Sequence, residues 1–191
     1  MSPARLVIVS GPPGAGKSQV AARIAGRFAL VLLSKDAIKE ILFDTLGTGE
    51  PRWSGMLSNA SFAALFVVAG QILQAGGEVL LEGNFRAGEH EPKLLALLAL
   101  RPCRVTQVLC RLPEEARLQR LEQRAARAER HPGHLDRLFQ RRSAQRPGPG
   151  SDFLDLPGTR IVHDTGGNAD DAWARLVPDL EPLLKTAGER T

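Results

Sequence analysis

The chain has 191 residues, of which 43 % are hydrophobic and 24 % are charged, and its formal net charge at pH 7 is +4. This length and composition fit one α/β domain, residues 1–191, with a substantial core and no room for a second full domain. The apolar runs 6–9 and 60–73 are too short for a signal peptide and for a membrane span, so we expect a cytoplasmic protein that does not enter a membrane.

The two cysteines, Cys103 and Cys110, fall in one predicted strand at an odd spacing. Because side chains alternate between the two faces of a strand, the thiols should lie on opposite faces of the sheet. A disulfide between them is therefore not expected, which suits a reducing compartment.

The first predicted element is a short buried strand at residues 6–9, followed at once by a glycine-rich loop and a helix from residue 17. The loop has the pattern G-x-x-x-x-G-K-[ST] and consists of Gly11, Pro12, Pro13, Gly14, Ala15, Gly16, Lys17 and Ser18. In such a loop, backbone N–H groups surround phosphates, the lysine reaches the β- and γ-phosphates, and the serine hydroxyl binds Mg²⁺. We therefore predict a P-loop that binds ATP and Mg²⁺.

Helices and strands alternate along the rest of the chain. Strands are predicted at 29–33, 79–81, 104–110 and 160–163, and helices at 17–28, 36–43, 58–75, 92–100, 113–130, 135–142 and 169–184, with a polar, glycine-rich stretch at 45–55. This order predicts a three-layer α/β P-loop NTPase fold with a five-stranded parallel sheet and helices on both faces. Ligands of such sheets bind at the carboxyl ends of the strands, so chemistry is sought there.

Asp36 follows the second strand and faces the phosphates of the predicted nucleotide site. A carboxylate at this place can accept the proton of an attacking hydroxyl, which makes Asp36 the candidate catalytic base. The alternative is that Asp36 caps the helix that begins there. Lys39, one turn further on, is either a substrate contact or an ordinary surface lysine.

Glu82 ends the third strand with the pattern of a Walker B acid. It can hold Mg²⁺ together with Ser18, orient the acceptor, or act as the base, and the alternative is a solvated carboxylate at a strand end. Asn84 and Arg86 follow it in the loop 84–91, where we expect substrate contacts. Arg86 is alternatively an ion-pair partner of Glu82 or Glu89.

Residues 111–146 hold ten arginines against five acidic residues, so the basic charge of the chain is concentrated there. The spacing of Arg117, Arg120, Arg124 and Arg127 places them on one stripe of a helix. We predict an arginine-rich helical lid at about 113–146. Arg124 and Arg127 would stabilise the transferring phosphoryl group, and Arg120 and Arg130 would contact the nucleotide. The alternative is a solvated helix face paired with its own glutamates.

His131 and His134 flank a Pro-Gly turn at the end of this helix. No cysteine or acidic cluster lies near them in the sequence, so a metal site is disfavoured. A structural turn, or one that gates the substrate, is the preferred interpretation.

Taken together, GPPGAGKS, LSKDAIKE, LLEGNFR, the arginine-rich helix and VHDT resemble the small P-loop kinases over nearly the whole chain. The group that holds zeta toxins, chloramphenicol phosphotransferase and the 5′-kinase domain of phage polynucleotide kinase is the most similar. The resemblance implies that Asp36 activates the acceptor hydroxyl and that Lys39 matches a basic position, often arginine. It further implies that the E-G-x-x-R segment contacts substrate and that Asp164 and Thr165 lie near adenine.

Three functions remain. The first is transfer of the γ-phosphate of ATP to a hydroxyl of a small molecule by a monomer or homodimer. The second is a polynucleotide 5′-kinase, which the arginines favour but the scarcity of aromatic residues among them disfavours. The third is a nucleotide-binding regulatory ATPase. The acceptor itself, whether a metabolite, antibiotic, nucleoside or nucleotide sugar, is not encoded in any motif.

Overall fold

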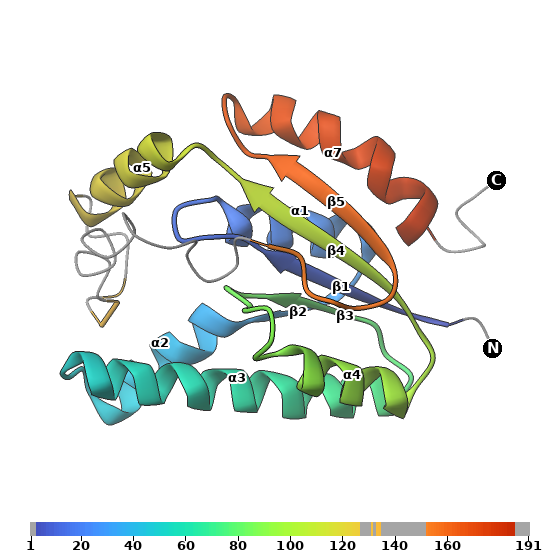
Figure 1. Ribbon diagram of the computed structural model, residues 1–191, viewed down its shortest axis with the longest axis horizontal. Helices are drawn as coiled ribbons and strands as arrows, with labels where there is room; N and C mark the ends of the chain where they lie inside the picture. The colour runs from blue at the N-terminus through green and yellow to red at the C-terminus, as the bar shows by residue number, and fades with distance from the viewer. Residues whose placement is uncertain (1–2, 127–130, 132, 135–151, 186–191) are drawn as a thin grey trace.

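The computed structural model describes residues 3–126, 131, 133–134 and 152–185 (Figure 1). Its five strands are β1 (Ala4–Ser10), β2 (Val31–Ser34), β3 (Val79–Glu82), β4 (Cys103–Arg111) and β5 (Thr159–Asp164). They form one parallel sheet in the order β2-β3-β1-β4-β5. The described helices are α1 (Lys17–Phe28), α2 (Lys35–Leu46), α3 (Pro51–Gln74), α4 (Glu91–Leu100), α5 (Glu114–Ala126) and α7 (Ala169–Leu184). The predicted fold class is confirmed.

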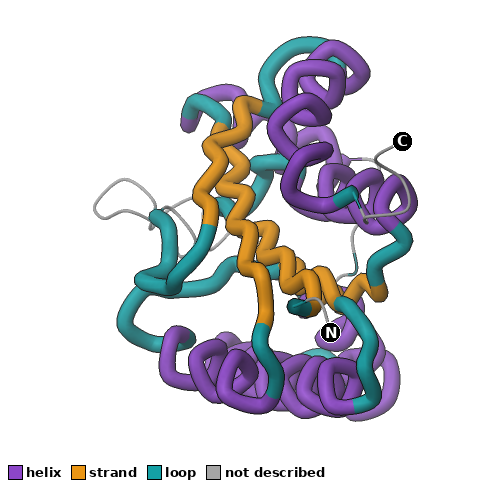
Figure 2. Tube along the Cα trace, turned by 90° about the vertical axis from the view of Figure 1, so that its right-hand side faces the viewer, coloured by secondary structure: helices purple, strands orange, loops and turns teal. Residues whose placement is uncertain are grey.

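The central strand β1 is buried along its whole length and sends alternate side chains to two separate cores. Leu6 and Ile8 pack with α3 and α4 on one face, whereas Val7 and Val9 pack with α1 and α7 on the other. Helices therefore cover both faces of the sheet, as Figures 1 and 2 show. The same alternation separates the cysteines: Cys103 packs on the α3 side, Cys110 on the α1 side, and both are free thiols.

Several predicted boundaries differ from the observed ones, and in three cases the reason is local. Strand β2 begins at Val31 rather than residue 29, because Ala29 adopts a left-handed conformation (φ 52°) that ends α1. Helix α2 begins at Lys35, because Ser34 and not Asp36 is its N-cap. Helix α3 begins at Pro51, where proline suits the first helical turn, so much of the predicted polar stretch is helical.

Helix α3 is long and apolar enough to cross a membrane by length and composition alone. Its side chains Phe62, Leu65 and Leu73 are instead packed into the core beneath the sheet. The helix also contacts α2 and α4 along its sides. One face of α3 is buried, as the sequence predicts, whereas Val67 on another face is 61 % exposed, and the helix starts earlier than predicted.

The carboxyl ends of the strands meet at one edge of the sheet. In the parallel register Glu82 lies beside Val9 on one side and beside Ser34 on the other. The P-loop follows β1 directly, and α2 follows β2 without an intervening loop. The sequence motifs that follow β1, β2 and β3 are therefore neighbours in space.

Gly158 lies just before β5, the outermost strand, and tests how tightly the chain packs there against β4. It has a φ of +118°, and a Cβ there would lie 2.3 Å from the carbonyl oxygen of Val105. We expect Gly158→Ala to lower the free energy of unfolding by about 2–4 kcal/mol, from backbone strain and the clash. Urea denaturation measures the change.

Gly26, exposed in the last turn of α1, is the matched control, because a Cβ there meets nothing within 4 Å. Gly26→Ala should raise the free energy of unfolding by about 0.5–1 kcal/mol. Equal effects of the two substitutions would contradict the packing described at Gly158.

Candidate active site

The P-loop connects β1 to α1 and touches α5. Gly16, in a left-handed conformation, is the N-cap of α1, so Lys17 and Ser18 occupy the first turn of the helix. Gly14 (φ +81°) passes so close to α5 that a Cβ would lie 2.8 Å from the carbonyl oxygen of Arg117. The Lys17 ammonium donates to the carbonyl oxygen of Pro12 at 3.1 Å. The loop therefore has the tight, glycine-dependent path that a phosphate-binding nest needs.

Glu82 is buried, with 1 % of its surface exposed, and lies between two serine hydroxyls. The hydroxyl of Ser34 donates to Oε2 at 2.6 Å, and that of Ser18 lies 3.4 Å from Oε1. The interpretation of Glu82 as a solvated carboxylate is therefore wrong. The structure brings together the two residues proposed for Mg²⁺, and their hydroxyl and carboxylate oxygens are the hard ligands that this ion prefers.

Ser34 is a site residue that the sequence analysis missed. Besides its bond to Glu82, its oxygen accepts the N–H of Ala37 at 3.4 Å and so caps α2. The capping interpretation of Asp36 is therefore wrong, because the serine two residues earlier has that role. Serine just before a predicted helix is the usual N-cap signal, and this signal was present in the sequence.

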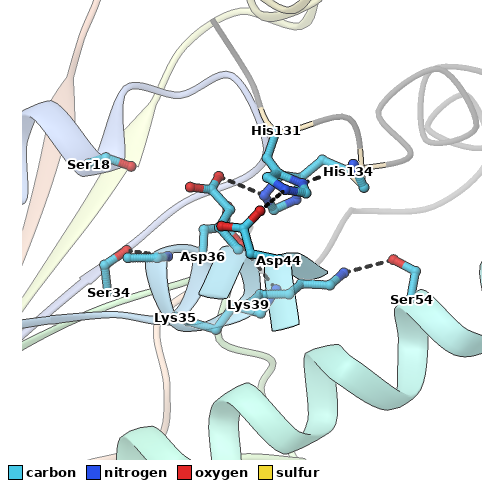
Figure 3. Close-up of polar contacts among 12 residues, drawn as sticks. Ser18, Ser34, Lys35, Asp36, Lys39, Asp44, Ser54, His131 and His134 are labelled. Carbon is cyan, nitrogen blue, oxygen red and sulfur yellow. Dashed lines mark hydrogen bonds and ion pairs between the residues drawn. The ribbon is translucent and has the colours of Figure 1, made fainter. Parts of the chain in front are cut away.

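Asp36 lies in the first turn of α2, one-third exposed, with Oδ1 at 3.1 Å from the ammonium of Lys35. Lys39 is not a surface lysine, since only 7 % of it is exposed. Its ammonium donates to the hydroxyl of Ser54 on α3 at 2.9 Å, and Figure 3 shows the side chain extending away from Ser18 and Ser34. Lys39 thus joins α2 to α3.

The loop after β3 is held by a histidine that the sequence analysis did not single out. The backbone N–H of Arg86 donates to Nδ1 of His90 at 2.9 Å, and the His90 ring packs 4.2 Å from that of Phe62. The Arg86 guanidinium is half-exposed and pairs with Glu89 at 3.1 Å, one of the two predicted ion-pair alternatives. Asn84, in the same loop, is half-buried.

The first two arginines of α5 bind main-chain oxygens of neighbouring loops. Arg117 donates to the carbonyl oxygen of Pro13 at 3.1 Å, and Arg120 donates to that of Thr165 at 2.7 Å. The helix therefore rests on the P-loop and on the loop after β5. Arg124 is half-buried. The predicted lid residues Arg127 and Arg130, and the predicted helix 135–142, lie outside the described residues.

A pocket of about 400 Å³, counted with the solvent at its mouth, lies beside the P-loop. Its lining includes Gly16, Gln19, Arg120, Thr165, Gly167 and Trp173. The hydroxyl of Thr165 donates to the carbonyl oxygen of Ala15 at 3.0 Å, so the loop after β5 is tied to the P-loop. Asp164 is exposed and accepts the N–H of Gly166 at 2.8 Å.

The turn that contains His131 and His134 packs on α2, far from it in sequence. His131 Nε2 lies 2.9 Å from Asp44, and His134 Nε2 lies 2.9 Å from Glu40 (Figure 3). The ring of Phe43 lies between these acids on the helix and stacks on His131. The acidic partners are therefore distant in the sequence, and within the described part of the chain no three potential ligands gather into a metal site.

Comparison with known proteins agrees with this architecture. The model of the AAA domain family AAA_33 matches residues 6–149. The chain belongs to this family. A search of curated protein sequences finds no match for the AAA_33 chain.

Several solved structures share the fold of this AAA_33 chain. A protein from Chloroflexus aurantiacus j-10-fl, assigned as a kinase, is 28 % identical with a TM-score of 0.78, over 96 % of this chain and 99 % of that one. A sugar kinase from Janibacter sp. HTCC2649 is 18 % identical with a TM-score of 0.61 over 96 % and 99 %. The APS kinase CysC of Mycobacterium tuberculosis, solved with AMPPNP and APS, is 18 % identical with a TM-score of 0.55 over 94 % and 99 %.

Ser34 provides a stability test of the site. Ser34→Ala removes the N-cap of α2 and leaves the buried Glu82 carboxylate with one hydroxyl fewer. We expect the free energy of unfolding to fall by about 2–3 kcal/mol. The control is Ser61→Ala, at a buried serine whose hydroxyl donates to the carbonyl oxygen of Leu57 one turn earlier in α3. A loss as large in the control would contradict a special role of Ser34.

His90 provides a pH test. Burial lowers the pKa of His90 below its ordinary value of 6.5, although the charge of Glu89 opposes the shift. The unfolded chain therefore binds a proton that the folded chain does not, and stability is lost as the pH falls below 6.5. In His90→Asn, whose amide oxygen can replace Nδ1 as acceptor, urea denaturation between pH 7 and pH 5 should show a smaller loss. His163, whose pKa is also lowered by burial, stays in both proteins. Equal losses would mean that His90 does not contribute.

Proposed function

We propose that this chain is an ATP- and Mg²⁺-dependent phosphotransferase that moves the γ-phosphate of ATP to a hydroxyl of a small molecule. The observation that carries the proposal is the contact between Ser18 of the P-loop and the buried carboxylate of Glu82, on the sheet edge where α2 presents Asp36. A phosphate nest, a metal-binding pair and a base candidate are the parts that phosphoryl transfer needs.

The nucleotide is held from two sides. Residues 11–18 bind the phosphates, with Lys17 on the β- and γ-phosphates. The pocket between Gly16 and Thr165 receives the nucleobase, with Arg120 held beside it by its bond to Thr165 and with Asp164 next in the chain. This is the same place that the resemblance to small P-loop kinases indicates for adenine. The APS kinase of similar fold was solved with the ATP analogue AMPPNP, which supports ATP as the donor.

Ser18 and Glu82 would hold Mg²⁺, which neutralises charge on the phosphates when bound. The donor set fits, because the buried Glu82 carboxylate contacts the hydroxyls of Ser18 and Ser34, and carboxylate and hydroxyl oxygens are the hard ligands that Mg²⁺ prefers. Ser34 orients the carboxylate through Oε2.

Asp36 is the base. Its carboxylate takes the proton of the acceptor hydroxyl as that oxygen forms a bond to the γ-phosphorus, and the bond to the β–γ bridging oxygen breaks with its electron pair leaving on ADP. Arg124 and Arg127 would stabilise charge on the transferring group, and Arg130 would contact the nucleotide.

The acceptor would lie between α2, the loop 84–91 and the lid, with Asn84 and Arg86 as contacts. Lys39 acts there indirectly, through its bond to Ser54. The sugar kinase and the APS kinase that share the fold support a small molecule as acceptor. Within small P-loop kinases, the likeness to zeta toxins, chloramphenicol phosphotransferase and polynucleotide kinase remains part of this proposal.

The test is transfer from γ-labelled ATP with Mg²⁺ to pooled sugars, antibiotics, nucleosides, nucleotide sugars and a 5′-hydroxyl oligonucleotide. We expect label to enter one small-molecule pool. Label in the oligonucleotide alone would establish the polynucleotide kinase instead. Free phosphate with no labelled acceptor would favour the regulatory ATPase.

Once an acceptor is identified, Asp36→Asn should lower kcat about 10²- to 10⁴-fold while ATP binding is retained. The matched control is Asp44→Asn, on the same helix but paired with His131. Near-normal transfer by Asp36→Asn would remove Asp36 as the base.

A further inference from the structure

Lys35 is a buried charge at this sheet edge that none of the steps above uses. We propose that Lys35 is the positioning residue of Asp36, holding its carboxylate in place and in the ionised form that accepts a proton. This inference rests on the proposed function, in which Asp36 is the base.

The burial of Lys35 requires an explanation. Only 5 % of its side chain is exposed, whereas lysine is almost never fully buried unless it is paired. Among the described residues, Asp36 is the only acidic residue within ion-pair distance of its ammonium, at 3.1 Å. The cost of burying the ammonium is therefore offset chiefly by one carboxylate, which is the candidate base.

This contact does not follow from helix geometry, since neighbouring positions on a helix do not face each other. Surrounding elements confine the lysine. Its ammonium lies 5.7 Å from the ring centroid of Phe62 on α3, a cation–π distance. Next to β3, Gly83 leaves room for the stem, because a Cβ there would lie 3.3 Å from the Cβ of Lys35. The side chain is thus enclosed between α3 and the end of β3 and is directed to Asp36.

The charges around Asp36 show why a cation is needed. Glu82 lies at the same edge, bound by Ser34 two residues before Asp36, and Glu40 lies one turn further along α2. Negative charges disfavour the ionisation of a nearby carboxyl group. Among the basic groups on and near α2, the Lys39 ammonium donates to Ser54 on α3. His131 pairs with Asp44, and His134 pairs with Glu40. The ammonium of Lys35 contacts the Asp36 carboxylate directly, and an opposite charge within about 4–6 Å favours the ionised carboxylate.

A direct test needs no substrate. Carbon-detected NMR follows the titration of the Asp36 carboxyl, which Asp36→Asn identifies in the spectrum. We expect the midpoint to rise by about one pH unit in Lys35→Met and Lys35→Gln, and to stay near the wild-type value in Lys35→Arg, which keeps the charge. Having two neutral variants guards against one that fails to fold. Thermal unfolding and ATP binding show that each variant retains its structure.

The matched control is Lys39→Met, at a second buried lysine of α2. Because its ammonium donates to Ser54 on α3, Lys39→Met should move the Asp36 midpoint less than Lys35→Met does. A midpoint that is unchanged in folded Lys35→Met, or shifted equally in Lys39→Met, would overturn the proposal. A purely structural role of Lys35 would change stability without moving this midpoint.

With an acceptor known, the acid limb of the kcat profile should move to higher pH by the same amount in Lys35→Met and should be restored in Lys35→Arg. The two proposals fail in different ways. Transfer that occurs with an unchanged Asp36 titration contradicts the role of Lys35 alone. A shifted titration in a protein that transfers phosphate to no acceptor supports the coupling of Lys35 to Asp36 and contradicts the kinase.

Discussion

A carboxylate that is almost completely buried at the end of a central strand must be supplied with hydrogen bonds, and Glu82 receives them from two different segments. Ser18 comes from the P-loop that follows β1, and Ser34 comes from the junction of β2 and α2. Because β3 lies between β1 and β2 in the sheet, one side chain connects both neighbours. The relative positions of the phosphate loop and of α2 therefore depend on this carboxylate.

The position of helix α2 depends on Glu82 through its N-cap. Ser34 caps it, so its first turn is fixed relative to Glu82, and Lys35 and Asp36 occupy that turn. One turn further, Lys39 binds α3 through Ser54. At its far end, Phe43 stacks on His131. A single twelve-residue helix thus carries the base candidate Asp36 and is linked to Glu82, to α3 and to the turn that contains His131.

The opposite side of the site is organised by backbone contacts. Arg117 and Arg120 bond to the carbonyl oxygens of Pro13 and Thr165, and the Thr165 hydroxyl bonds to Ala15. Helix α5, the P-loop and the loop after β5 are therefore linked through main-chain oxygens, which any side chain can supply. Because every residue has a main-chain oxygen, such contacts do not require particular residue types. The spacing of the arginines therefore predicted a lid but not the partners of Arg117 and Arg120.

The local spacing of residues in the sequence determined much of the fold and the position of the P-loop. The P-loop, the alternation of strands and helices, the separation of the two cysteines and the helix at 169–184 all follow from spacing within a few residues, where chain geometry alone sets which side chains share a face. The tertiary structure alone decided the pairing of Ser34 with Glu82, the burial of Lys35 and Lys39, and the approach of His131 and His134 to Asp44 and Glu40. Those hydrogen-bonded pairs are 48, 87 and 94 residues apart in the sequence. They exist because β2 lies beside β3 and because the turn at 131–134 returns to α2, and no local periodicity encodes either arrangement.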